Sequence, residues 1–125
     1  MTAGLLVAVA VGGLIGAPTR YLVDRAITAR IATERPWGTV IVNISGSLLL
    51  GLLAGLSLAR HLPITAGALF GDGFCGAYTT FSTFTYETVR LVEDGDLLEA
   101  ATNVAVSVAG GLAAAAAGVA VGLHL

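Results

Sequence analysis

The chain has 125 residues, a formal net charge of −2, only 11% charged residues and a mean hydropathy of +0.89. A typical soluble domain carries about 25% charged residues, so this composition excludes an ordinary soluble protein and predicts one that folds in a lipid bilayer. The basic residues are six arginines that form no cluster, which argues against nucleic-acid binding.

A helix needs roughly 20 mostly apolar residues to cross a bilayer, and four windows of the sequence meet this requirement. We therefore predict an all-α membrane protein with four transmembrane helices in a single domain over residues 1–125. The predicted spans run approximately over Leu5–Thr28, Trp37–Leu58, Pro63–Leu91 and Leu97–Leu123.

The first window contains a charged residue, Arg20, at a depth where a charge costs roughly 2.5–3.5 kcal/mol. Two interpretations remain open. The side chain either snorkels toward the interface and pairs with Asp24, one helical turn away, or lines a wet vestibule and draws anions to the mouth of a pore.

The second window contains Asn43 within the apolar run Val40–Gly46. An amide between apolar neighbours has two donors and one acceptor group that need partners on another helix. Asn43 therefore either makes an interhelical hydrogen bond or donates to a passing anion.

The third window is longer than the roughly 20 residues of one straight crossing. Its glycines, Gly71 and Gly73 among them, precede a run of threonines, and both residue types weaken a helix. We predict two half-helices that meet near Gly76–Thr80, with the hydroxyl of Thr79 or Thr80 capping the second half. The alternative is one continuous, kinked helix.

A break of this kind exposes both ends of the helix backbone. The first half ends in free carbonyl groups with partial negative charge, and the second begins with free N–H groups with partial positive charge. The carbonyls near Gly76 and Thr79 suit a hard cation such as sodium, whereas the donors beyond the break face a small anion.

Aromatic and polar side chains follow the predicted break. Phe81 and Phe84 share a helix face, so the two rings either pack in a core or turn their positive edges toward an anion. Ser82 supplies a hydroxyl donor on another face of the helix. In the fourth window Asn103 and Ser107 lie four residues apart and form a polar stripe, which either serves packing or continues a polar track.

Each window carries one Gly-x-x-x-Gly pattern, which allows close helix packing. The pairs are Gly12/Gly16, Gly51/Gly55, Gly67/Gly71 and Gly118/Gly122. Four short spans are few to enclose an aqueous path, so we expect an oligomer. The loops after the first and third windows hold four arginines against one, Arg60, in the middle loop, and this count places both termini outside.

No combination of residues indicates catalysis, and we expect a protein that is not an enzyme. Ser82 has no nearby histidine and acid to activate it. His61 and His124 lie far apart in the sequence, without the spacing of a metal site.

Three motifs are more specific than the composition. They are Gly-Gly-Leu-Ile-Gly-Ala-Pro-Thr-Arg-Tyr over residues 12–21, Val-Asn-Ile-Ser-Gly over residues 42–46 and Gly-Ala-Tyr-Thr-Thr-Phe-Ser-Thr-Phe over residues 76–84. With these motifs the chain resembles the CrcB/Fluc fluoride channel family over nearly its whole length. The resemblance implies an antiparallel, dual-topology dimer of four-span subunits, with the third helix broken mid-membrane and two narrow fluoride pathways.

The same resemblance implies roles for individual residues. Arg20 would line the vestibule, and the backbone carbonyls of Gly76 and Thr79 would hold a structural Na+ at the dimer centre. The uneven arginine count leaves open whether the chain pairs with itself or with a homologous chain of opposite orientation. The fluoride pathway would be lined by Asn43, Thr80, Phe81, Ser82, Phe84, Asn103 and Ser107.

With this resemblance, we expect a fluoride-selective channel that passively exports F− across the inner membrane of a prokaryotic cell and confers fluoride resistance. Two alternatives remain. One is a proton-coupled exporter of small molecules with dual topology, which needs a carboxylate near the middle of an early span, where the sequence offers only Asp24 near an end. The other is a non-conducting structural subunit of a membrane complex.

Overall fold

The computed structural model describes residues 2–31 and 35–125, and over these residues the chain is helical with short connections and no strand. Three helices are long and apolar enough to cross a membrane, namely α1 (Ala3–Arg30), α2 (Trp37–Leu58) and α6 (Leu97–His124). They confirm the first, second and fourth predicted windows as helices and differ from the predicted bounds by at most two residues. The chain is thus a multi-pass membrane protein.

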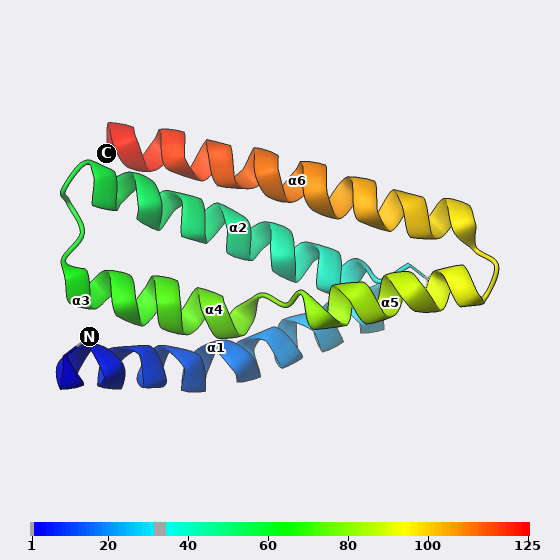
Figure 1. The fold of residues 1–125 in the computed structure, drawn as a ribbon, viewed down its shortest axis with the longest axis horizontal. Coiled ribbons are helices and arrows are strands. Elements are labelled where there is room, and N and C mark those ends of the chain that lie inside the picture. The colour runs from blue at the N-terminus through cyan, green and yellow to red at the C-terminus, as the bar shows by residue number, and fades with distance from the viewer. Residues whose placement is uncertain (1, 32–34) are drawn as a thin grey trace.

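The third window folds into several consecutive segments (Figure 1). A single turn, α3 (Ile64–Ala66), leads into the wider π-helical segment η1 (Gly67–Cys75) and then into α4 (Gly76–Tyr78). After Tyr78 the helix stops, because Thr79 is extended with φ −82° and ψ 160°. The chain becomes helical again in α5 (Ser82–Glu93), so the interruption covers residues 79–81.

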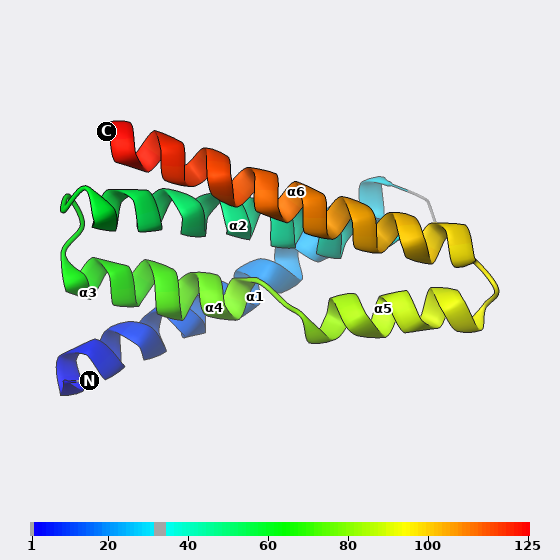
Figure 2. The same ribbon diagram turned by 45° about the horizontal axis from the view of Figure 1, so that its top comes forward.

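Close packing at glycines joins α2 to α6 along their length (Figures 1 and 2). A side chain at Gly51 would collide with the carbonyl oxygen of Ala115 on α6, and one at Gly118 would collide with that of Leu48 on α2. Gly55 and Gly122 meet in the same way. Small residues on both helices therefore let the two backbones touch, as membrane helices require for strong van der Waals packing.

A second glycine seam joins α1 to η1, and here one predicted pair is wrong. Gly12 and Gly16 lie directly against the backbone of η1, as expected. On η1, however, Gly73 makes the close approach, whereas a methyl group at Gly67 or Gly71 would meet only leucine side chains at ordinary distances. The π-helical turn changes which face each glycine occupies, so α-helical spacing selected the wrong pair.

The ends of the helices are held by local contacts. Gly95, with φ +83°, turns the chain from α5 into α6, and the N–H of Asp96 returns to the carbonyl of Leu91. Arg35 forms an ion pair with Glu99 at the start of α6 and lies over the ring of Trp37. The hydrogen bond to Glu99 raises the pKa of Arg35 above its usual value.

The chain buries few of its side chains and exposes many large apolar ones. Leu14, Ile64 and Leu98 are each about three-quarters exposed, at 74%, 75% and 77%. Such a surface would aggregate in water, but it matches a bilayer or a second protein subunit. Both termini lie at the same end of the bundle (Figures 1 and 2).

Candidate functional site

The interruption between α4 and α5 is held open by Asn43 on α2. The Asn43 Oδ1 accepts a hydrogen bond from the N–H of Thr80, and its Nδ2 donates to the carbonyl oxygen of the same residue, both at 2.8 Å. Asn43 therefore makes the interhelical bond that was one of its two expected roles. Its amide also has a second N–H, which is left for another acceptor.

Hydroxyl groups complete both sides of the interruption. The Thr79 Oγ1 donates to the carbonyl of Cys75 (2.8 Å) and closes the last turn of α4. The Thr80 Oγ1 accepts from the N–H of Thr83 (3.2 Å) and caps the first turn of α5. Of the two expected caps, Thr80 is therefore the one that forms, and its hydroxyl also lies 3.3 Å from that of Ser82.

A groove of about 300 Å³ runs past the interruption and collects most of the predicted pathway residues. The rings of Phe81 and Phe84 lie in its wall with centroids 5.9 Å apart and planes tilted by 47°. Phe84 is half-buried, whereas Phe81 is 78% exposed. The groove is lined by Asn43, Gly46, Ser47, Leu50, Thr79, Thr80, Phe81, Phe84, Ser107 and Val108.

The polar stripe on α6 contains two buried atoms without a partner. Asn103 is 5% exposed, and its Nδ2 donates to Thr88 Oγ1 on α5 (2.8 Å). Its Oδ1 and the Oγ of Ser107 are buried and accept or donate no hydrogen bond within the described residues. A buried polar atom without a protein partner is a group that can bind a water molecule or an ion. Ser107 lies in the groove wall, whereas Ser82 and Asn103 do not.

Arg20 reaches the interruption from α1. Its Nη1 donates to the carbonyl oxygen of Thr79 (3.3 Å). The ion pair with Asp24, part of one expected arrangement, is not formed among the described residues; Asp24 instead lies against Gly38, where a side chain would collide with its carboxylate. Arg20 and Asp24 both line a separate cavity of about 170 Å³ beside Thr80 and Thr83.

The resemblance implies the carbonyls of Gly76 and Thr79 as ligands of a cation, and these residues are the first residue of α4 and the residue that follows α4. The N–H of Thr80, which would reach the carbonyl of Gly76 in a continuing helix, is taken by Asn43. Gly76 is exposed, and a methyl group there would meet nothing within 4 Å. The carbonyl of Gly76 therefore loses its usual helical partner, whereas that of Thr79 accepts from Arg20.

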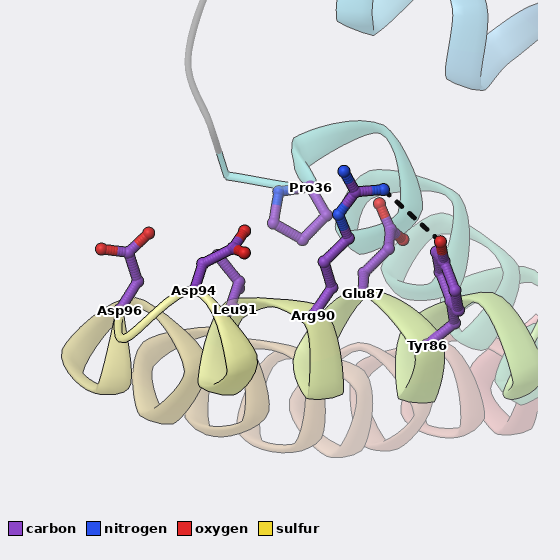
Figure 3. A pocket seen from close by; sticks show the side chains of 7 residues that line it. All are labelled: Pro36, Tyr86, Glu87, Arg90, Leu91, Asp94 and Asp96. Carbon is purple, nitrogen blue, oxygen red and sulfur yellow. Dashed lines mark hydrogen bonds between the residues drawn. The ribbon is translucent and has the colours of Figure 1, made fainter.

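Two polar contacts between α5 and other helices were not predicted from the sequence. Thr39, which is 4% exposed on α2, donates to the carboxylate of Glu87, and Thr88 accepts from Asn103. A hydroxyl inside an apolar window is a weak signal, since Thr also bonds to its own helix backbone. Glu87 also borders the larger cavity in Figure 3, of about 610 Å³, where Arg90 donates to the hydroxyl of Tyr86 (3.4 Å).

Comparisons with known proteins agree on one family. The family model described as "CrcB-like protein, Camphor Resistance (CrcB)" matches residues 7–119. A relative from Nocardia farcinica named "Fluoride-specific ion channel FluC 1" is 54% identical over 111 residues, which cover 89% of this chain and 75% of the relative. A relative of the same name from Frankia casuarinae is 52% identical over 114 residues, covering 87% and 88% of the two chains. "Fluoride-specific ion channel FluC 2" from Mycobacterium tuberculosis is 49% identical over 118 residues, covering 94% and 90%.

Proposed function

Because this chain belongs to the CrcB family, we propose that it is a fluoride-selective ion channel through which F− leaves the cytoplasm passively. The observation that carries this proposal is the groove at the helix interruption. It brings the ring pair of Phe81 and Phe84 together with the amide of Asn43 and the hydroxyl of Ser107, which has no partner in the part of the chain that the structure describes. All of these groups offer positively polarised hydrogen atoms and none carries a charge.

The mechanism replaces the water around a small, strongly hydrated ion in steps. The free N–H of Asn43, the hydroxyls on both sides of the rings and the ring edges of Phe81 and Phe84 would each supply part of the lost hydration. A series of moderate sites lets an ion enter and still leave. The hydroxyls in this series are those of Thr80, Ser82 and Ser107, and Asn103 extends the polar track on α6.

The groove is open on one side, which supports a second copy as its other wall. Phe81 is 78% exposed in the protomer, and the interruption beside it would sit mid-membrane if α3, η1, α4 and α5 form the fourth crossing. We assign the second copy the opposite orientation, as the family resemblance implies. A homologous chain of opposite orientation would close the groove equally well, and the uneven arginine count leaves this alternative open.

A sodium ion is the cofactor that this arrangement would take. The carbonyls of Gly76 and Thr79 from each of two subunits would surround it at the dimer centre, with Arg20 close by. Hard oxygen ligands suit such a cation. When bound, it supplies positive charge that holds the two interrupted helices together. Arg20 adds a positive charge near the pathway and would draw anions into the vestibule.

Passive conduction is sufficient for export from a prokaryotic cell. A negative interior drives an anion outward by about 2.3 kcal/mol per 100 mV. Fluoride enters as the neutral acid and dissociates in the cytoplasm, so an open pathway in the inner membrane lowers the trapped anion and confers fluoride resistance.

Fluoride efflux from liposomes that contain the purified protein tests the proposal. We expect rapid efflux of fluoride, much slower efflux of chloride and no dependence on a proton gradient. Phe81→Ile and Phe84→Ile should each abolish efflux, because an aliphatic side chain has no polarised ring edge. Phe70→Ile is the matched control, since Phe70 lies on η1 outside the groove. Full fluoride efflux in both test variants would rule out the ring-edge contacts, and no efflux from the unchanged protein would rule out the channel.

A further inference from the structure

Helix α5, which begins directly after Phe81 and carries Phe84, has little apolar packing of its own. Within α5 only Leu91 is buried. Two adjacent side chains fasten this helix to others among the described residues: Glu87 accepts from Thr39 on α2, and Thr88 accepts from Asn103 on α6. The position of α5 therefore depends on a few polar contacts more than on burial.

Thr88 links α6 directly to the backbone of a groove residue. Its Oγ1 donates to the carbonyl oxygen of Phe84 at 2.8 Å and accepts from Asn103 Nδ2 at 2.8 Å. A hydroxyl has one proton, and here that proton is used at Phe84. The oxygen of Thr88 can then only accept, so the amide of Asn103 must present its Nδ2 to Thr88.

We propose that Thr88 is a positioning residue for Phe84: through Asn103 it sets the place of α5 against α6, and so the place of the ring edge in the groove. This inference rests on the proposed fluoride pathway. Thr88 does not line the groove, so it acts through Phe84 and not on the ion. The buried Asn103, which is 5% exposed, excludes water that would otherwise compete for the contact.

Thr85 offers a matched control on the same helix. Its hydroxyl donates to the carbonyl of Phe81 at 2.9 Å, which is the same local bond that Thr88 makes to Phe84. Thr85 is exposed and has no side-chain partner on another helix among the described residues. A comparison of the two threonines thus separates the interhelical contact from the local one.

The experiment measures fluoride efflux per folded protein and the preference for fluoride over chloride in liposomes. For Thr88→Val we expect efflux to fall about tenfold, the factor that corresponds to the loss of one hydrogen bond with buried partners, together with a lower preference for fluoride. Thr88→Ser keeps the hydroxyl and should stay within about twofold of the unchanged protein, as should Thr85→Val. If Thr88→Val does not fold, Thr88→Ala serves in its place.

Several outcomes would overturn the proposal. Unchanged efflux and selectivity in Thr88→Val, an equal loss in Thr85→Val, or a full loss in Thr88→Ser would each show that the link between α5 and α6 does not position the ring. A double-mutant cycle with Asn103→Leu adds a further test, because residues that act through one contact are not additive. If the unchanged protein conducts fluoride, failure of these variants concerns Thr88 alone and leaves the channel function standing.

Discussion

At the scale of single residues, side chains at the interruption take over bonds that a helix backbone would normally make. Asn43 pairs with both polar groups of the Thr80 backbone, and the hydroxyl of Thr80 caps α5. An unpaired peptide group in a bilayer costs several kcal/mol. Polar side chains beside the break therefore lower its cost in a bilayer. In the proposed pathway, the remaining N–H of Asn43 would in addition donate to an anion.

Ser107 differs from these residues because its buried hydroxyl has no partner among the described residues. We expect Ser107→Ala to leave the free energy of unfolding unchanged or to raise it by about 1 kcal/mol, since the substitution breaks no hydrogen bond among the described residues. Fluoride efflux should nevertheless fall, because a donor to the ion is lost. Thermal unfolding and liposome efflux, measured on the same preparation, check the two effects.

Ser45→Ala provides the contrast for this test. The Ser45 hydroxyl bonds to the carbonyl of Val42 and lies 3.0 Å from the hydroxyl of Tyr78, and it is not part of the groove lining. Here we expect lower stability with efflux retained. If Ser107→Ala instead lowered stability and kept full efflux, its hydroxyl would be a structural group.

At the scale of helices, glycines decide which elements lie next to each other. The seam between α2 and α6 brings carbonyl oxygens of one helix against glycines of the other. We expect Gly51→Ala to push the helices apart and to destabilise the protein by about 1–3 kcal/mol, as overpacking does. Resistance to thermal or chemical denaturation in detergent measures the effect.

Gly67→Ala is the matched substitution on η1. The added methyl group there would meet only the side chain of Leu62 at 3.6 Å, an ordinary contact. This variant should keep the stability of the unchanged protein. A loss as large as that of Gly51→Ala would mean that any added methyl group weakens the bundle, and that the α2–α6 seam is not special.

At the scale of the whole molecule, the proposed second subunit would cover the open groove and the exposed Phe81. Gly76 offers a test of where this subunit binds. The backbone at Gly76 is already helical, with φ −60° and ψ −36°, and a methyl group would meet nothing within 4 Å. Within one protomer Gly76→Ala should therefore be neutral or stabilising by roughly 0.5–1 kcal/mol. In the proposed dimer the same methyl group would enter the sodium site.

We accordingly expect Gly76→Ala to weaken subunit association and fluoride efflux while the helical content stays unchanged. Energy transfer between labelled subunits in liposomes, together with circular dichroism, measures both quantities. Gly4→Ala, near the start of α1 and with only Thr2 nearby at 3.9 Å, serves as the control. Full association and efflux in Gly76→Ala would place the subunit contact elsewhere.

Much of this protein could be predicted from the order of its residues. Apolar windows of sufficient length determine α1, α2 and α6, because a bilayer demands long uninterrupted apolar helices. The glycine pairs of α1, α2 and α6 predicted close packing, and the threonine-rich run after Gly76 marked where helical propensity fails. Each of these properties depends on residues that are close together in the sequence, so a short segment is enough to predict it.

Only the tertiary structure decided which partners meet. Three side-chain contacts join residues on different segments of the chain, and each depends on how the helices rotate and shift against one another. These pairs are Asn43 with Thr80, Thr88 with Asn103, and Thr39 with Glu87. On η1 the close contact with α1 is made by Gly73 and not by the predicted pair Gly67 and Gly71, because the wider π-helical turn changes the face on which each residue lies. A hydrogen bond between helices requires its donor and acceptor atoms to lie within about 3 Å of each other. Hydropathy and residue spacing along the sequence do not give the distances between atoms on different helices.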